Sequence, residues 1–154
     1  MKRAAFHSLW VRAKPGQRTR GWLLAGPFAV PVALGRGGIR ANKREGDGGT
    51  PRGTFRLRRL WWRADRMARP MTHLPVRLKS DHPGDRLKRA DHLYDLIIEL
   101  DHNIRPRIAG RGSAVFVHVA RPGFAPTAGC VALKADALRR LIARIGPRTR
   151  IVIG

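Results

Sequence analysis

Residues 114–146 read AVFVHVARPGFAPTAGCVALKADALRRLIARIG, and this stretch decides the fold class. Its first part, residues 114–119, is a short apolar run that predicts a largely buried strand. A loop rich in proline and glycine follows over residues 120–129. The helix after it is predicted from apolar residues at the helical spacing i, i+3, i+4 and i+7: Leu138, Leu141, Ile142 and Ile145. Gly146 and Pro147 predict its end.

Working outward from this stretch, alternation of apolar and polar residues predicts further strands. They span residues 7–13, 20–25, 28–34, 54–60, 94–100 and 150–153. Residues 63–92 are polar, basic and interrupted by proline and glycine, and their pattern assigns no element. Strands with one helix indicate a β-rich α/β fold, and nothing in the composition marks a linker, so we expect a single domain over residues 1–154.

The composition sets wide limits on the protein class. The chain has 154 residues, of which 43% are hydrophobic and 27% charged, which excludes wholesale disorder. No apolar run reaches about 18 residues, so we expect no transmembrane segment. Cys130 is the lone cysteine, so no internal disulfide can form.

The charge is far from balanced. Lysine and arginine number 32 against 10 acidic residues, for a net charge of +22, and such a surface attracts polyanions. Since 26 of the 32 are arginine and they are spread along the chain, a compositional bias explains the charge as well as a binding role does. Residues 56–63, RLRRLWWR, mix basic and aromatic side chains as single-strand binders do, without any nucleic-acid-binding motif. We expect non-specific polyanion binding and no specific nucleic acid; the sequence does not indicate an oligomeric state.

The N-terminal region superficially resembles a secretory signal peptide. Six positive charges precede the apolar residues 22–34. Gly26, Pro27 and Pro31 interrupt that apolar stretch, and residues 7–13 before it alternate like a strand. We therefore interpret the region as three strands joined by turns, and not as an export signal.

His118 and Cys130 are the strongest candidates for chemistry. A cysteine attacks a carbonyl group as its thiolate, and a neighbouring imidazole can generate that thiolate. His118 lies near the end of a predicted strand and Cys130 follows the next loop, so the chain can return and bring the two together. Gly129 places backbone N–H groups where they could face an oxyanion. A structural cysteine beside a core histidine is the alternative that spacing leaves open.

Two further patterns favour no ligand. The glycine-rich residues 35–53 contain neither phosphate-binding fingerprint and precede a strand, so we expect no nucleotide site. Three Asp-His pairs recur every ten residues: Asp81-His82, Asp91-His92 and Asp101-His102. The residues around them do not repeat, and His-x-x-x-His and Cys-x-x-Cys spacings are absent. We expect neither a metal nor a cofactor.

Three sequence segments, in the order in which they occur, indicate a known family. Residues 33–55 contain Thr-Pro-Arg-Gly-Thr-Phe, residues 91–95 and 110–118 end at His118, and residues 127–133 surround Cys130. Together they resemble the L,D-transpeptidase catalytic-domain family of bacterial cell-wall enzymes over about residues 7–153, and most of all a short proteobacterial branch of it.

This resemblance implies a sandwich-like β domain with a helix after a catalytic cysteine. It implies a transferase that acts on peptidoglycan tetrapeptide stems, in cell wall organization and cell shape, in the periplasm or cell envelope. The cysteine would attack the carbonyl between the third residue and the terminal D-alanine, and D-alanine would leave a thioester behind. If the amine of another stem then attacks the thioester, the reaction is transpeptidation. If water attacks it, the reaction is that of an L,D-carboxypeptidase. If an amine of an envelope protein attacks it, the protein is transferred to peptidoglycan. A non-enzymatic basic module that binds anionic polymer is the alternative of another class.

The resemblance also assigns roles residue by residue. Cys130 would be the nucleophile and His118 the base, with the imidazole oriented by the backbone carbonyl of Val119. Backbone N–H groups of Gly129 and Cys130 would form part of the oxyanion hole. The turn at Thr50, Pro51 and Gly53 would lie near the cleft.

Three positions depart from the family's common pattern Ser-His-Gly-Cys-x-Arg. Thr127 stands for the serine, Ala128 for the second histidine and Ala132 for the arginine. Because that arginine is expected to hold polar groups of the substrate, Arg111 and Arg121 are candidates to replace it, and Thr127 is a candidate substrate contact.

Overall fold

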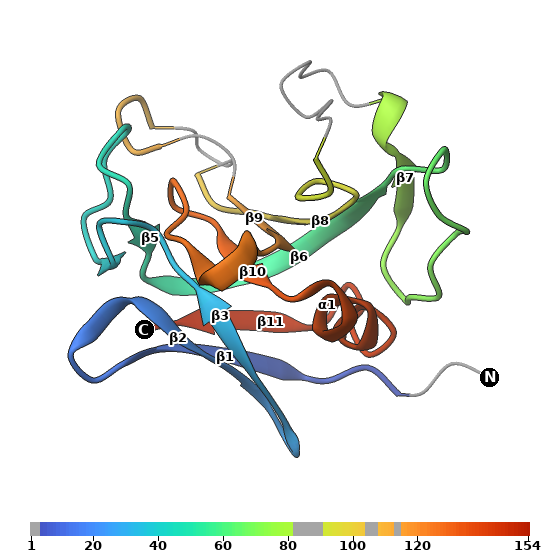
Figure 1. Ribbon diagram of the computed structural model, residues 1–154, viewed down its shortest axis with the longest axis horizontal. Coiled ribbons are helices and arrows are strands. Elements are labelled where there is room, and N and C mark those ends of the chain that lie inside the picture. The colour runs from blue at the N-terminus through green and yellow to red at the C-terminus, as the bar shows by residue number, and fades with distance from the viewer. Residues whose placement is uncertain (1–3, 82–90, 104–107, 113–114) are drawn as a thin grey trace.

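A computed structural model describes residues 4–81, 91–103, 108–112 and 115–154 (Figure 1). The strands are β1 (Ser8–Lys14), β2 (Gln17–Ala25), β3 (Phe28–Ala33), β4 (Ile39–Arg40), β5 (Thr50–Pro51), β6 (Gly53–Trp62), β7 (Val76–Leu78), β8 (Leu96–Leu100), β9 (Phe116–Val119), β10 (Val131–Leu133) and β11 (Arg150–Ile153). The helix is α1 (Ala135–Ile142), and 3-10 turns span Lys79–Asp81 and Pro122–Phe124. The described part of the chain thus matches the expected β-rich fold with one helix.

The main sheet closes on itself. Nine strands follow the order β11-β1-β2-β3-β10-β9-β8-β6-β7, and an additional pairing joins β11 to β6. In that pairing Ile151 lies opposite Phe55 and Ile153 opposite Gly53. The first half of the long strand β6 pairs with β11, and its second half pairs with β8. The result is a barrel-like sheet, so the sandwich-like arrangement expected from the resemblance is wrong in this respect.

The N-terminal strands form as the alternation predicts. β1, β2 and β3 pair in antiparallel order, and the apolar residues 22–34 supply much of β2 and all of β3. Leu23 of β2 is buried, whereas Trp22 and Leu24 on either side of it are exposed. Period-two alternation therefore gives this part of the sheet one buried and one exposed face.

The main core fills the interior of the closed sheet. Buried aliphatic side chains come from strands all round the sheet, and α1 adds Leu138, Leu141 and Ile142. Each such side chain contributes about 1.5–3 kcal/mol by leaving water. Ile145 is buried as the helical spacing predicts, although it lies beyond the end of α1.

The turn after α1 is held by the buried Thr149. Its hydroxyl donates to the carbonyl oxygen of Phe6 at 2.6 Å and accepts the N–H of Gly146 at 3.0 Å. These bonds satisfy a polar group inside the fold and lead the chain into β11. Within the described residues, no helix has the length and apolar character needed to cross a membrane.

Strand β8 is buried on both faces and so separates two clusters. Leu96, Ile98 and Leu100 belong to the main core, while Ile97 packs on the opposite face. There it meets Trp61 of β6 and Phe116 of β9, with Tyr94 and Cys130 packed against the three. This second cluster lies behind the candidate active site.

Within the described residues, four short strands were not predicted: β4, β5, β7 and β10. Each has two or three residues, too few to show a period of two. β7 belongs to the unassigned residues 63–92, of which residues 82–90 lie outside the described part. The strand predicted at residues 114–119 is observed as β9, and residues 113–114 are likewise outside the description.

Candidate active site

The register of β9 and β10 brings the two reactive residues to one face. These neighbouring strands run parallel, with Val117 opposite Val131 and His118 opposite Ala132 (Figure 1). Side chains alternate along a strand, so His118 shares its face with the residue just before β10, which is Cys130. The two side chains are therefore diagonal neighbours across adjacent strands.

Cys130 is a partly buried thiol. Its Sγ accepts a hydrogen bond from the backbone N–H of Phe116 at 3.4 Å and packs against the second cluster. Burial raises the pKa of the Cys130 thiol, while the Phe116 N–H and the charge of Lys43 act in the opposite direction. Since burial is the largest cause, the resting group is a protonated thiol, and attack on a carbonyl needs a base.

His118 is buried, with 6% of its surface exposed, and its ring is oriented. Nδ1 lies 2.8 Å from the carbonyl oxygen of Val119. A carbonyl oxygen only accepts, so Nδ1 carries a proton, and Nε2 is the ring atom at which a neutral imidazole would accept one. Tyr94 packs edge-on against the imidazole, with ring centroids 5.1 Å apart. This arrangement suits a general base.

The loop before Cys130 is braced by Thr127. The Thr127 hydroxyl donates to the carbonyl oxygen of Cys130 at 2.6 Å and accepts the N–H of Gly129 at 3.1 Å. Both hydrogen-bonding functions of this side chain are thus used inside the loop. The Gly129 N–H, a sequence candidate for the oxyanion hole, is bonded to Thr127 in this state.

The glycine-rich residues 35–53 form a wall against this loop. The backbone N–H of Thr127 donates to the carbonyl oxygen of Leu34 at 2.9 Å. The backbone carbonyl oxygen of Thr127 accepts the N–H of Arg36, also at 2.9 Å. A Cβ on Gly129, whose φ is +140°, would lie 2.8 Å from the carbonyl oxygen of Gly49. Only glycine fits such a close approach, so these glycines serve backbone packing.

The predicted turn at Thr50, Pro51 and Gly53 divides into two roles. Thr50 is fully buried, and its hydroxyl accepts the N–H of Gly35 at 2.9 Å. Gly53 begins β6 with a φ of +146°, close to the ring of Phe55. Thr50 and Gly53 therefore support the wall, whereas Pro51 lines a pocket beside it.

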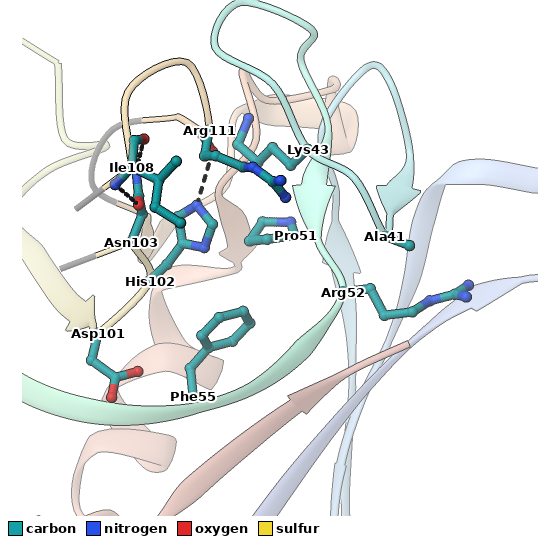
Figure 2. Close-up of a pocket in the computed structure, with 10 residues that line it drawn as sticks. All are labelled: Ala41, Lys43, Pro51, Arg52, Phe55, Asp101, His102, Asn103, Ile108 and Arg111. Atoms are coloured by element: carbon teal, nitrogen blue, oxygen red, sulfur yellow. Dashed lines mark hydrogen bonds between the residues drawn. The ribbon is translucent and has the colours of Figure 1, made fainter. Parts of the chain in front are cut away.

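That pocket has a volume of about 250 Å³ (Figure 2). Its lining residues are Ala41, Lys43, Pro51, Arg52, Phe55, Asp101, His102, Asn103, Ile108 and Arg111. Of the two arginines proposed as substrate contacts, Arg111 lines the pocket and Arg121 does not. Arg121 is exposed before the 3-10 turn, where its carbonyl oxygen accepts the N–H of Phe124.

Lys43 is a site residue that sequence reasoning missed. Its Nζ lies 3.3 Å from Oδ1 of Asp47, and only 9% of the residue is exposed. A Cβ on Gly129 would lie 3.5 Å from that Nζ, which places the ammonium beside the cysteine loop. The available signal was weak: one lysine four residues before one aspartate, in a loop where charges are normally solvated.

Asp47 anchors Lys43. Its carboxylate accepts the N–H of Arg44 at 2.8 Å and that of Gly49 at 2.7 Å. These two bonds are the main reason that the pKa of Asp47 falls to about 2, with Lys43 contributing as well. The aspartate is therefore ionised at neutral pH and holds the lysine in place.

The Asp-His series has separate surroundings. His92 lies 2.7 Å from Asp95, and Nε2 of His102 donates to the carbonyl oxygen of Arg111 at 3.3 Å. His82 lies outside the described residues. Among those that are described, no group of three or more His, Cys, Asp or Glu side chains is arranged to hold a metal ion.

Comparison with known proteins identifies the family. The chain matches the family model YkuD, L,D-transpeptidase catalytic domain, over residues 7–153. Comparison with curated proteins gave no significant match. The fold is similar to that in the structure of Bdellovibrio bacteriovorus Bd1075, with a TM-score of 0.56 and 14% identity, covering 98% of this chain and 48% of that one. The chain thus spans about half of that structure, and the likeness concerns the fold alone.

Proposed function

The chain belongs to the L,D-transpeptidase catalytic-domain family, and we propose that it is a cysteine acyltransferase acting on peptidoglycan tetrapeptide stems. The family supports L,D-transpeptidase-type activity on peptidoglycan in general. The observation that carries the finer proposal is the parallel register of β9 and β10, which sets His118 and Cys130 on one face. We further propose that residues 1–154 act as one catalytic domain in the periplasm or cell envelope.

In the proposed acylation, Nε2 of His118 takes the proton of the Cys130 thiol as sulfur attacks the carbonyl carbon before the terminal D-alanine. A C–S bond forms and the carbonyl π electrons move to oxygen. When the tetrahedral intermediate collapses, the C–N bond breaks and His118 returns the proton to the leaving amine. D-Alanine departs, and the stem remains as a thioester on Cys130.

The second half-reaction reverses these roles. An amine from a neighbouring stem attacks the thioester, His118 accepts its proton, and the Cys130 thiol is restored as the new amide forms. Water in place of the amine would yield a free carboxylate and L,D-carboxypeptidase activity. An amine of an envelope protein would yield a protein linked to peptidoglycan.

The oxyanion would be stabilised by backbone N–H groups. We assign the N–H of Cys130 first, because Gly129 donates to Thr127 in the resting state. Gly129 would join only after exchanging that bond for the oxyanion.

The test is a digestion of disaccharide-tetrapeptides by the unmodified chain and by Cys130→Ala, analysed by mass spectrometry. We expect D-alanine loss and cross-linked dimers with the unmodified chain alone. D-Alanine loss without dimers would assign the carboxypeptidase reaction. Turnover that survives in Cys130→Ala, or no turnover in either, would overturn the proposal.

A second property is favoured by the outer face of β1 and β2, which we call the basic-aromatic face: Trp10, Arg12, Lys14, Trp22 and Leu24. Trp10 and Trp22 are 40% and 39% exposed. Arg12 lies 5.5 Å from the Trp10 ring and Lys14 4.7 Å from the Trp22 ring. With a net charge of +22, this face supports binding of anionic envelope polymer alongside catalysis.

A further inference from the structure

Lys43 connects the pocket to the cysteine loop. It lines the pocket, and its Nζ lies 3.5 Å from the position that a Cβ on Gly129 would take. A Cβ on Gly112, on the opposite side, would lie 3.0 Å from its Cε. The lysine is therefore enclosed between two loops, and a group bound to it would lie beside Cys130.

The lining of the pocket is cationic. Three lining side chains are cationic: Lys43, Arg52 and Arg111. Figure 2 shows Arg52 extending away from the other two, and the Arg111 guanidinium lying over Pro51 on the side of Lys43. His102 faces them, and it is neutral at pH 7 because burial lowers its pKa and the charge of Lys43 lowers it further. Lys43 and Arg111 can therefore bind an anion in addition to Asp47, which already pairs with Lys43.

The anionic side chains nearby are directed elsewhere. Asp101 accepts the N–H of Arg56 at 2.9 Å, and Figure 2 shows its carboxylate pointing away from His102. Asp47 occupies one of the three N–H groups of Lys43 and is itself bound to two backbone N–H groups. The other two N–H groups of the Lys43 ammonium have no hydrogen-bond partner among the described residues.

The non-polar part of the lining suits a short aliphatic chain. Pro51, Phe55 and Ile108 supply it, and the Phe55 ring packs edge-on against His102 with centroids 5.6 Å apart. No cation comes from β10 itself, where Ala132 lies opposite His118.

We propose that this pocket binds a free carboxylate of the donor stem, with Lys43 as its principal cation and Arg111 as the second. The inference rests on the proposed function and specifies how the stem is held. Two carboxylates have this chemistry: that of the terminal D-alanine, and the second carboxylate of diaminopimelate at the third position.

The test measures binding separately from turnover. In a Cys130→Ala background, calorimetry gives the Kd for the disaccharide-tetrapeptide with Lys43 intact and with Lys43→Met. Losing a charged hydrogen bond is expected to raise Kd about 10- to 100-fold. Lys43→Arg should restore most of the affinity, and the matched control Arg139→Met on α1, which removes a distant exposed charge, should leave Kd unchanged.

The ligand side of the test identifies the carboxylate. One stem carries lysine in place of diaminopimelate, and another carries an amidated C-terminus. The stem that lacks the relevant carboxylate should bind weakly and lose its sensitivity to Lys43→Met. If both altered stems bind as tightly as the natural one, the proposal is overturned.

Two further measurements distinguish a loss of binding from a loss of folding. Lys43→Met breaks the ion pair to Asp47, so its thermal melting is recorded, and Arg111→Gln provides a second test that leaves that pair intact. Unchanged Kd in both variants, with Cys130-dependent turnover in the unmodified chain, overturns this inference alone. Turnover that does not depend on Cys130, or no stem binding by the unmodified chain, overturns the proposed function and this inference with it.

Discussion

The Nδ1 atom of His118 lies 2.8 Å from the backbone carbonyl oxygen of Val119. This contact holds the imidazole through the main chain of the same strand, so the side chain at position 119 takes no part in it. The proton on Nδ1 leaves Nε2 as the atom that accepts one, on the face shared with Cys130.

If His118 is the base, His118→Gln should lower turnover of tetrapeptide stems by about 10²- to 10⁴-fold without unfolding the protein. Val119→Ala is the control, because it keeps the orienting carbonyl and should keep most of the activity. Initial rates by mass spectrometry, with circular dichroism for folding, measure both. A fully active His118→Gln variant would contradict the role.

Cys130 should react slowly with alkylating reagents at neutral pH. Burial raises its pKa, so the thiolate fraction, and with it the alkylation rate, should climb about tenfold per pH unit through pH 8 and still be rising at pH 9. Lys43→Met should slow the reaction further at each pH, since the lysine charge lowers that pKa. A rate that levels off below pH 7 would mean a preformed thiolate.

Thr127→Val should loosen the cysteine loop. The substitution keeps the shape but removes the hydroxyl that bonds the Cys130 carbonyl and the Gly129 N–H, which costs about 1–3 kcal/mol of unfolding free energy. Urea denaturation measures the loss. Thr127→Ser retains the hydroxyl and should stay within about 1 kcal/mol of the unmodified chain. A Thr127→Val variant as stable as the unmodified chain would contradict the bracing role of the hydroxyl.

Asp47→Asn should destabilise the fold in a pH-dependent way. The folded-state pKa of Asp47 is lowered to about 2, below its unfolded value of 3.8, so its stabilisation is complete above about pH 4 and is lost as the pH falls toward 2. We expect the variant to be less stable at pH 7 and to approach the unmodified chain near pH 2. A stability difference that does not change with pH would argue against the ionised carboxylate.

The basic-aromatic face should bind isolated sacculi in a salt-sensitive way. Binding should weaken between about 0.01 M and about 1 M salt, as the Debye length falls from roughly 30 Å to roughly 3 Å. Arg12→Ser with Lys14→Ser should weaken pelleting with sacculi more than Arg139→Ser with Arg148→Ser, which removes the same charge elsewhere. Equal effects would assign binding to net charge alone, and salt-independent or absent binding would exclude it.

Local sequence patterns predicted the elements that form from residues close together in the chain. The helix and the longer strands were predictable because alternation and the i, i+3, i+4 spacing report which side chains must leave water. The short strand β10 was not, because its three residues pair only once β3 and β9 lie on either side. Closure into a barrel was also missed, since it depends on β6 meeting β11 across nearly a hundred residues of chain.

By itself, the sequence determined the family, the β-rich class and the candidate pair His118 and Cys130, because those follow from residue types in order along the chain. The tertiary structure alone decided that Thr127 braces the cysteine loop, that Arg121 lies away from the pocket, and that Lys43 stands beside Gly129. Segments far apart in the chain meet at these places. Their contacts are set by backbone close approach and burial, which leave no period in the sequence.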